Sequence, residues 1–251
     1  MHASIAEQLV ALNRRFYTDF GESFSATRGR IQPGVRRVLD GLGKGERILD
    51  LGCGNGQLAR ALAAEGFHGT YLGLDFSAPL LAAARSGSAG LSVTYRQLDL
   101  TAPDWEAEMT RGPADPSVPP ARFDVIFAFA FLHHVPGHER RRGILQKVRS
   151  LLAPGGKFVH SEWQFLNSEK LQARIQPWDR AGLQAADVEP GDTLLDWRAG
   201  GTGLRYVHQF SEPELELLAT ESGFRVAESF YSDGQGGRLA LYQFWEACEG
   251  D

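Results

Sequence analysis

Apolar residues in the first part of the chain recur every three or four positions, which is the spacing of one helix face. The positions are Ile5, Leu9, Leu12, Phe16 and Phe20. From residue 47 onward, short apolar runs alternate with helical stretches, and the runs are RILDL, TYLGLD, LSVTYRQLD, FDVIFAFAF and KFVHSEW. This alternation is typical of a parallel sheet with crossover helices. We therefore predict an N-terminal helical arm over residues 1–45 and an α/β core over residues 46–163.

The pattern changes twice more toward the end of the chain. Residues 211–251 contain a helix with Ser211 and Glu214 at capping-box spacing, followed by two apolar runs around a glycine-rich turn, which predict a hairpin. The expected fold is Rossmann-like α/β, a doubly wound, mostly parallel sheet of seven strands with a C-terminal antiparallel hairpin that completes it. Residues 164–210 interrupt the alternation as a mixed helical and irregular stretch. An insertion after the fifth strand lies where ligands bind, so we predict a substrate lid.

A glycine-rich loop at residues 47–56, RILDLGCGNG, joins a buried strand to a helix. Glycines allow a sharp turn and a close approach to a ligand. The dinucleotide fingerprint would need its third glycine at Gln57, one position beyond Gly56. Asp50 would repel a pyrophosphate and attract an ammonium group. Asp75 follows Gly56 by 19 residues, where an acid can bind both ribose hydroxyls. The loop therefore favours a ligand with a ribose, an amine and no phosphate.

With this DLGCGNG loop, residues 46–163 resemble the class I S-adenosylmethionine-dependent methyltransferases. The resemblance implies a methyl-transfer enzyme with S-adenosylmethionine as its cofactor. The implied cofactor-binding residues are Asp50, Gly52, Cys53, Gly54, Asp75, Phe76, Leu98, Asp99, Phe127 and Ala128. Within this set, Asp75 would hold the ribose and Asp99 would accept the exocyclic amine of adenine. The stretch 127–132 would close the floor beneath the methyl group.

Simpler structural roles are open to the same residues. Asp50 and Asp75 could only cap the helices that follow them, and Asp99 could be a turn residue without a ligand. Because aromatic residues alternate along FAFAF, one parity of that strand belongs to the core.

Segments that flank the core give an indication of the methyl acceptor. Residues 24–28, 191–192 and 205–210 are similar to the matching segments of the methyltransferases that esterify 5-carboxymethyluridine at the tRNA wobble position. The acceptor-side candidates from these segments and from the loop after the fourth strand are Arg28, His133, Arg205, Tyr206 and His208. Two arginines, Arg28 and Arg205, could clamp a carboxylate, and Tyr206 and His208 could contact a base. A carboxylate is ionised at neutral pH, so its esterification needs no general base.

Some of these flanking residues could instead have structural roles. Arg28 could pair with a core acid, and Tyr206 could pack inside the lid. The resemblance further implies that a small zinc-binding activator subunit accompanies the enzyme, as in the eukaryotic members. The alternative is a small-molecule methyltransferase of the same fold that acts on a small acid or another metabolite. The sequence leaves the acceptor atom, the activator and the oligomeric state open.

The amino-acid composition limits the classes of binding partner that we expect. The 251 residues include 26 basic and 31 acidic ones, and the net charge of −5 argues against tight nonspecific binding of DNA or RNA by the chain alone. No apolar run approaches the roughly 20 residues that span a bilayer, and the N-terminus is unlike a signal peptide, so a cytoplasmic location without membrane contact is expected. The proline-rich stretch 111–122 predicts an exposed loop.

The sequence contains no pattern typical of a metal site. Cys53 and Cys248 lie far apart, and although His134 and His138 have ligand spacing, Pro136-Gly137 interrupts a helix there. Two other function classes receive less support. The position of the third glycine disfavours an NAD-dependent oxidoreductase, and a catalytically silent binding module stays open because a fold does not guarantee turnover.

Overall fold

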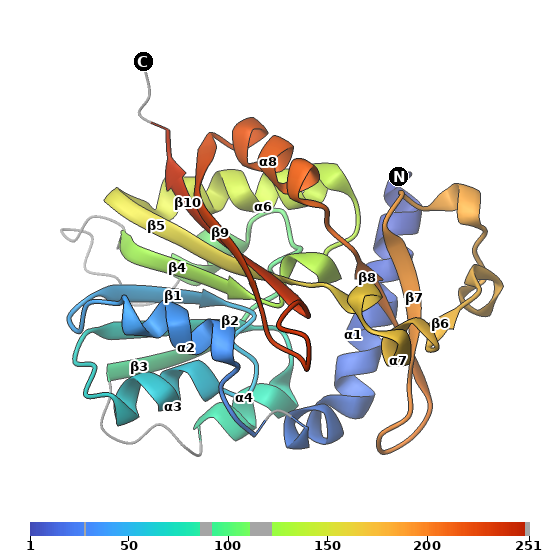
Figure 1. Ribbon diagram of the computed structural model, residues 1–251, viewed down its shortest axis with the longest axis horizontal. Helices are drawn as coiled ribbons and strands as arrows, with labels where there is room; N and C mark the ends of the chain where they lie inside the picture. Colours follow the sequence, from blue (N-terminus) through green and yellow to red (C-terminus); the bar gives the residue numbers. More distant parts are fainter. Residues whose placement is uncertain (28, 86–91, 111–121, 249–251) are drawn as a thin grey trace.

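The computed structural model of the chain describes residues 1–27, 29–85, 92–110 and 122–248. Its main sheet has seven strands in the order β3-β2-β1-β4-β5-β10-β9 (Figure 1). The strands are β1 (Arg47–Leu51), β2 (Thr70–Asp75), β3 (Ser92–Gln97), β4 (Phe123–Phe129), β5 (Leu152–Trp163), β9 (Phe224–Ser232) and β10 (Ala240–Ala247). The first five strands pair in parallel, and β10 runs antiparallel to both β5 and β9. The predicted fold class and the C-terminal hairpin are confirmed.

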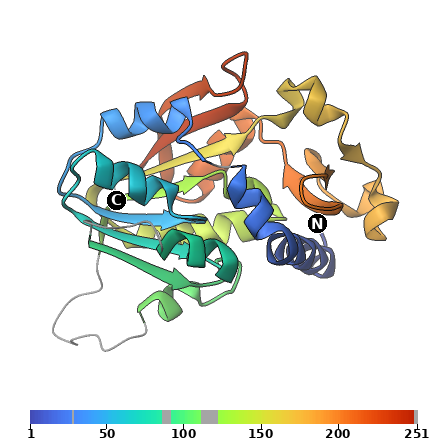
Figure 2. The ribbon, with the colours of Figure 1, turned by 90° about the horizontal axis from the view of Figure 1, so that it is seen from below.

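Helices cover both faces of this sheet (Figures 1 and 2). They are α2 (Pro33–Asp40), α3 (Gln57–Ala64), α4 (Ala78–Arg85), α5 (Trp105–Thr110), α6 (His138–Leu151) and α8 (Glu212–Glu221). The apolar sides of α2 and α3 pack on one face with Ile48 and Phe127. The apolar sides of α5, α6 and α8 pack on the other face with Leu49 and Phe158. The central strands β1 and β4 are thus buried on both sides, which explains their continuous apolar runs in the sequence.

The predicted N-terminal arm consists of two helices with different partners. The long helix α1 (Ala3–Ala26) packs against the insertion, where Leu9 contacts a cluster with Tyr206 and Phe16 lies 5.6 Å from the ring of Trp197. The second helix, α2, begins at Pro33 and packs on the core sheet. Proline is favoured in a first helical turn because its missing N–H would have no helical partner there.

The insertion contains a second sheet that the sequence analysis did not predict. Three antiparallel strands, β6 (Ile175–Gln176), β7 (Asp192–Trp197) and β8 (Gly203–His208), lie beside the carboxyl edge of the main sheet (Figure 1). The shorter elements around them are η1 (Leu132–His134), η2 (Phe165–Asn167), α7 (Glu169–Gln172), η3 (Trp178–Ala181) and η4 (Ala185–Asp187). The expectation of a mixed helical and irregular stretch missed these strands, because polar side chains are buried in β7 and β8 and hide the strand alternation.

Two other sequence predictions concern segments away from the insertion. Residues 111–121, most of the predicted proline-rich loop, lie outside the described residues. Among the helices that the structure describes, none is both long and apolar enough to cross a membrane.

Candidate active site

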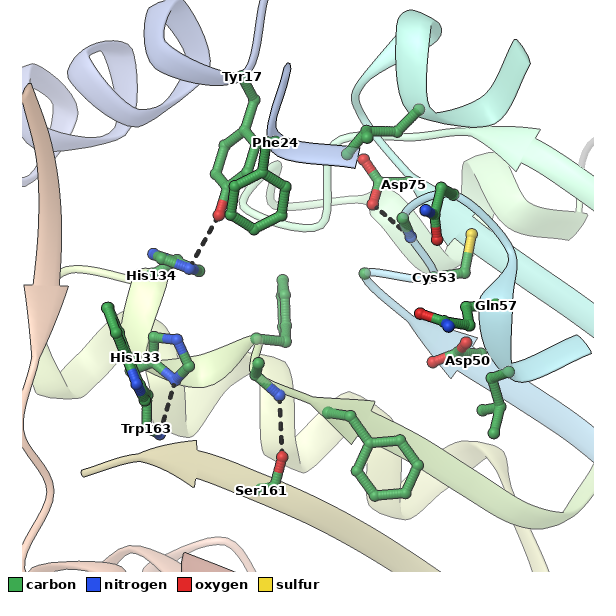
Figure 3. Close-up of a pocket in the computed structure, with 18 of the residues that line it drawn as sticks. Tyr17, Phe24, Asp50, Cys53, Gln57, Asp75, His133, His134, Ser161 and Trp163 are labelled. Atoms are coloured by element: carbon green, nitrogen blue, oxygen red, sulfur yellow. Dashed lines mark hydrogen bonds between the residues drawn. The ribbon is translucent and has the colours of Figure 1, made fainter. Parts of the chain in front are cut away.

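The carboxyl ends of β1, β2 and β4 open onto a cavity of about 350 Å³, with α1 and β8 on the opposite side (Figure 3). The glycine loop between β1 and α3 forms one wall. Helix α1 contributes Tyr17 and Phe24, and β8 contributes Arg205. The cavity is therefore built by three segments that are distant in the sequence: the α/β core, the N-terminal arm and the insertion.

Glycine is needed at two positions of the loop for different reasons. Gly54 has φ +54°, and a Cβ added there would meet no atom closer than 4.0 Å, so a side chain would extend into open space on the cavity wall. Gly56 has φ +74°, and a Cβ there would lie 2.5 Å from the Tyr95 hydroxyl and 2.8 Å from Ala84. The first glycine keeps the cavity open, and the second allows β3 and α4 to pack against the loop.

Two buried carboxylates occupy separate corners beside this loop. Asp75 accepts the N–H groups of Gly54 at 2.9 Å and Ser77 at 2.8 Å. Burial raises the pKa of Asp75 to about 6, although these N–H groups act in the opposite direction. Asp50 accepts a hydrogen bond from the hydroxyl of Tyr71, and burial raises its pKa to about 7. Both acids would gain from a ligand that donates hydrogen bonds or carries positive charge.

The end of β3 provides the next part of the wall. Leu98 is buried, and Phe76 lines the cavity beside it. Asp99 accepts the backbone N–H of Thr101 at 3.0 Å and its hydroxyl at 2.7 Å, and its other oxygen pairs with Arg14 from α1. Asp99 therefore has a turn-stabilising role and also lies on the cavity wall.

The thiol of Cys53 also lines the cavity, within the glycine loop. Burial raises the pKa of this thiol, and the carboxylates of Asp50 and Asp75 raise it further. Cys53 is therefore a neutral wall residue and not a reactive thiolate.

The floor of the cavity is formed by the later part of the predicted stretch 127–132. Phe127 and Ala128 are fully buried in the core and do not line the cavity, which corrects their assignment as cofactor-binding residues. Phe129, Ala130 and Phe131 line it instead, because β4 stays between its neighbours up to Phe129. Ala130 has φ +54°, and its N–H is held by Ser161 through the carbonyl oxygen at 2.9 Å and Oγ at 3.1 Å.

The strained backbone of Ala130 was missed by the sequence analysis. Left-handed backbone at a residue with a side chain costs energy and is concentrated at functional sites. The positive φ of Ala130, at the end of β4 and beside the cavity, indicates a functional position in the structure. No pattern in the sequence indicates it.

Arg205 brings a buried positive charge to the far end of the cavity. It is 4% exposed, and its guanidinium carbon lies 4.7 Å from the ring centroid of Trp163 and 5.9 Å from that of Phe24. Guanidinium groups stack on aromatic faces and bind planar carboxylates with two donors. The structure thus brings Arg205 to the cavity as predicted, whereas Arg28 lies outside the described residues.

His133 also lines the cavity, and a buried acid lies behind it. Its Nδ1 is 3.0 Å from Oε2 of Glu162, whose other oxygen is 3.0 Å from Nδ1 of His160. Burial raises the pKa of Glu162 and lowers that of His160 to about 3. The arrangement holds the His133 ring in place at the cavity wall, beside Trp163.

Two of the predicted acceptor-side residues do not reach the cavity. Tyr206 and His208 are almost fully buried on the opposite face of β8. The hydroxyl of Tyr206 donates to Asp192 at 2.6 Å, and His208 lies 2.7 Å from the same carboxylate. Successive side chains of a strand point to opposite faces, so Tyr206 is directed away from the cavity when Arg205 points into it. Their assignment to the acceptor site is therefore corrected.

His134 and His138, which have the sequence spacing of metal ligands, each contact another side chain of the protein. His138 pairs with Glu221 at 2.5 Å, while His134 contacts Tyr17 across the cavity. Within the ranges that the structure describes, no group of three histidine, cysteine or acidic side chains is placed to hold a metal ion. Among the cavity residues that the sequence analysis did not single out are Asn13, Tyr17 and Trp163.

Comparisons with known proteins agree on one kind of domain. Residues 24–229 match the family model described as a methyltransferase domain. A protein of Encephalitozoon cuniculi that is named as a methyltransferase is 29% identical over 215 residues, which cover 85% of this chain and 87% of that protein. The ubiquinone biosynthesis O-methyltransferase of Pseudomonas syringae is 34% identical over 119 residues, or 47% of this chain. The matched region spans only 44% of the length of that relative.

Solved structures share the fold at lower identity. An S-adenosylmethionine-dependent methyltransferase of Methanosarcina mazei has a TM-score of 0.61 and 20% identity, with 88% of this chain and 100% of that chain covered. The complex of DhpI with S-adenosylhomocysteine has a TM-score of 0.58 and 20% identity, with both chains fully covered. These similarities establish that the architecture around the cavity is one that other proteins also build.

Proposed function

The chain belongs to the methyltransferase domain family, and we propose that it methylates an acceptor whose carboxylate is held by Arg205. It is an S-adenosylmethionine-dependent methyltransferase. The methyl acceptor is the part of the function that the proposal adds.

The residues around the glycine loop fit this methyl donor. The position of Gly54 on the cavity wall leaves space that a Cβ would fill, Asp75 presents a carboxylate for the ribose hydroxyls, and Asp50 presents one for the ammonium group. Leu98 and Asp99 would flank the adenine. When bound, S-adenosylmethionine supplies an electrophilic methyl group on a sulfonium centre.

The chain itself contributes alignment and exclusion of water. Phe129, Ala130 and Phe131 form an apolar wall next to the glycine loop. In a displacement where opposite charges cancel, a dry pocket and correct orientation supply much of the rate increase. An acceptor held at the far end of the cavity would face the methyl group along this wall.

One observation carries the acceptor proposal: the nearly buried guanidinium group of Arg205 at the cavity wall. A buried cation is stabilised by an anion that makes charge-assisted hydrogen bonds to it. The rings of Trp163 and Phe24 beside it provide an apolar surface for the rest of the acceptor. A carboxylic acid with an apolar body satisfies both features.

Two classes of acceptor carry such a carboxylate. A small organic acid is our first candidate, because Tyr206 and His208, which were expected to contact a base, lie in the interior. The second candidate is 5-carboxymethyluridine at the tRNA wobble position, because its carboxylate could bind Arg205 equally well. An activator subunit and tRNA as partners belong to this second candidate only.

Methyl-labelled S-adenosylmethionine distinguishes the two acceptors. The purified chain is incubated with the donor and either total RNA or the small metabolites of an extract, and we expect label in the small-molecule fraction. Label in RNA would instead favour the wobble nucleoside, and label in neither pool would contradict both.

Substitution of Arg205 then tests its role. Arg205→Gln is expected to raise the acceptor KM by about 10-fold to 100-fold, which corresponds to the loss of a charge-assisted hydrogen bond. The donor Kd should not change. Arg198→Gln is the matched control, because Arg198 lies in the same insertion with a mostly exposed side chain paired to Asp196. An unchanged acceptor KM in Arg205→Gln would contradict the proposal.

A further inference from the structure

A hydrogen bond between Tyr17 and His134 crosses the cavity from α1 to η1 (Figure 3). The Tyr17 hydroxyl lies 2.9 Å from Nε2 of His134, and both residues line the cavity. Nδ1 of the same imidazole lies 3.3 Å from the backbone carbonyl oxygen of Tyr206. Because a carbonyl oxygen only accepts hydrogen bonds, Nδ1 carries the proton of the neutral ring. Nε2 is then the basic nitrogen, and the Tyr17 hydroxyl donates to it.

This polarity leaves the phenol oxygen of Tyr17 able to accept a hydrogen bond from a second partner. A hydroxyl that donates to an imidazole is also a stronger acceptor, because hydrogen bonds in a chain polarise one another. The ring of Phe24 lies 5.3 Å from the ring of Tyr17 and 5.9 Å from the guanidinium carbon of Arg205. Tyr17 and Arg205 therefore both lie near the same aromatic ring on the cavity wall.

We propose that Tyr17 is a catalytic residue that receives a proton from an acceptor hydroxyl, with His134 as the positioning residue that takes the proton of Tyr17 in turn. The inference rests on the proposed function. The acceptor is then a hydroxy acid, which binds Arg205 through its carboxylate and is methylated on its hydroxyl group. The inference excludes esterification of the carboxylate itself.

The proposed step is balanced. As the acceptor oxygen forms its bond to the methyl carbon, the carbon–sulfur bond breaks and its electron pair goes to sulfur. The acceptor proton moves to the oxygen of Tyr17, and the Tyr17 proton moves to Nε2 of His134. The resulting imidazolium keeps its Nδ1–H on the Tyr206 carbonyl. No further oxidant, reductant or co-reactant is needed.

The groups around His134 are compatible with this transfer. From α1 it faces Tyr17, and from its own turn it faces His133, whose ring lies 4.3 Å away with Glu162 behind it. From β8 it faces the carbonyl of Tyr206. Tyr17, His133 and the Tyr206 carbonyl carry no permanent positive charge, so none of them opposes the formation of the imidazolium.

The chemical nature of the product is the first test. Labelled product from the small-molecule pool is treated with mild alkali, which hydrolyses a methyl ester to methanol and leaves a methyl ether intact. We expect the label to remain on the product. Release of labelled methanol would overturn the inference while leaving the proposed function in place, whereas absence of any labelled product would contradict the proposed function itself.

Tyr17→Phe is the second test, with Tyr231→Phe as the matched control because its hydroxyl bonds Glu212 outside the cavity. At pH 7, Tyr17→Phe should lower kcat by about 100-fold with an unchanged donor Kd. The loss should shrink at pH 9, since more of the acceptor hydroxyl then ionises without help. His134→Gln should behave in the same way. An equal loss at both pH values would show that Tyr17 only packs α1 onto the cavity and would overturn the inference.

Discussion

The strand ends of the α/β core and the inward face of β8 in the insertion use buried polar residues in opposite ways. In the core, Asp50 and Asp75 lie at strand ends and turn toward a cavity where a ligand can bind them. In the insertion, Tyr206 and His208 turn inward and are satisfied by other residues of the chain. The comparison shows that polar residues in a motif-like segment need not face a ligand, because half of a strand's side chains face the other way.

An ionic cluster explains where the polar side of β8 is directed. The guanidinium of Arg141 in α6 is fully buried, donates to the Tyr206 hydroxyl at 2.8 Å, and lies 3.7 Å from Asp192 and 3.6 Å from Glu214. His208 bridges the same two carboxylates. This cluster connects the insertion to α6 and α8, so it fixes the face of β8 and thereby directs Arg205 into the cavity.

The largest effect is expected from breaking that cluster. Arg141→Met keeps much of the side-chain volume but leaves the carboxylates of Asp192 and Glu214 without their buried cation. Removal of one partner of a buried ion pair costs about 3–5 kcal/mol, so the free energy of unfolding in urea should fall by that amount.

A neighbouring arginine provides the control for this measurement. Arg142→Met removes a partly exposed pair with Glu139 and should change the free energy of unfolding by less than about 1 kcal/mol. If Arg141→Met and Arg142→Met have equal effects, the cluster does not hold the insertion to the core.

The predictable parts of the molecule were those with local causes. Asp75 was predicted correctly as a cavity residue because the strand, the turn and the acid lie within one short segment. The floor was predicted as residues 127–132, but only Phe129, Ala130 and Phe131 of this stretch line the cavity, since apolar alternation does not show where β4 leaves the core. Tyr17 and His134 are 117 residues apart, and only tertiary packing of α1 on the insertion brings them together.

Substitution of a core carboxylate should affect ligand binding much more than stability. Asp75→Ala removes the acceptor for the ribose hydroxyls and should weaken donor binding by roughly 1–3 kcal/mol. Isothermal titration calorimetry measures the change, and Asp40→Ala, at an exposed position at the end of α2, is the control. An unchanged donor Kd in Asp75→Ala would leave Asp75 with only its structural bonds to the backbone N–H groups of Gly54 and Ser77.

The raised pKa of Asp50, about 7, predicts opposite pH trends for stability and donor binding. In the unfolded chain the carboxyl has its ordinary pKa of 3.8, so between about pH 4 and 7 the folded chain holds a proton that the unfolded chain has released. The free energy of unfolding therefore falls as pH rises through this range, by up to about 1.4 kcal/mol per pH unit. Donor affinity rises over the same range, because the ammonium group needs the ionised carboxylate.

Asp50→Asn separates this contribution from those of other titrating groups. The difference in unfolding free energy between the variant and the original chain should grow in favour of the variant from pH 4 to 7, while the pH dependence of the donor Kd should flatten. Parallel pH curves for the two proteins in both measurements would show that Asp50 does not titrate in this range.

The smallest effect on donor binding is expected at Asp99. This residue lies on the cavity wall and is also hydrogen-bonded within the chain, so it combines the two roles compared above. Its carboxylate is about one-third exposed and already bonds Thr101 and Arg14. Asp99→Ala should weaken donor binding by about 0.5–1.5 kcal/mol if the carboxylate also accepts the adenine amine. Arg14→Ala, which removes only the exposed partner, should change stability by less than about 1 kcal/mol and leave the donor Kd within about twofold. Equal donor Kd values for both variants and the original chain would make Asp99 a turn residue alone, in the manner of the insertion's buried polar groups.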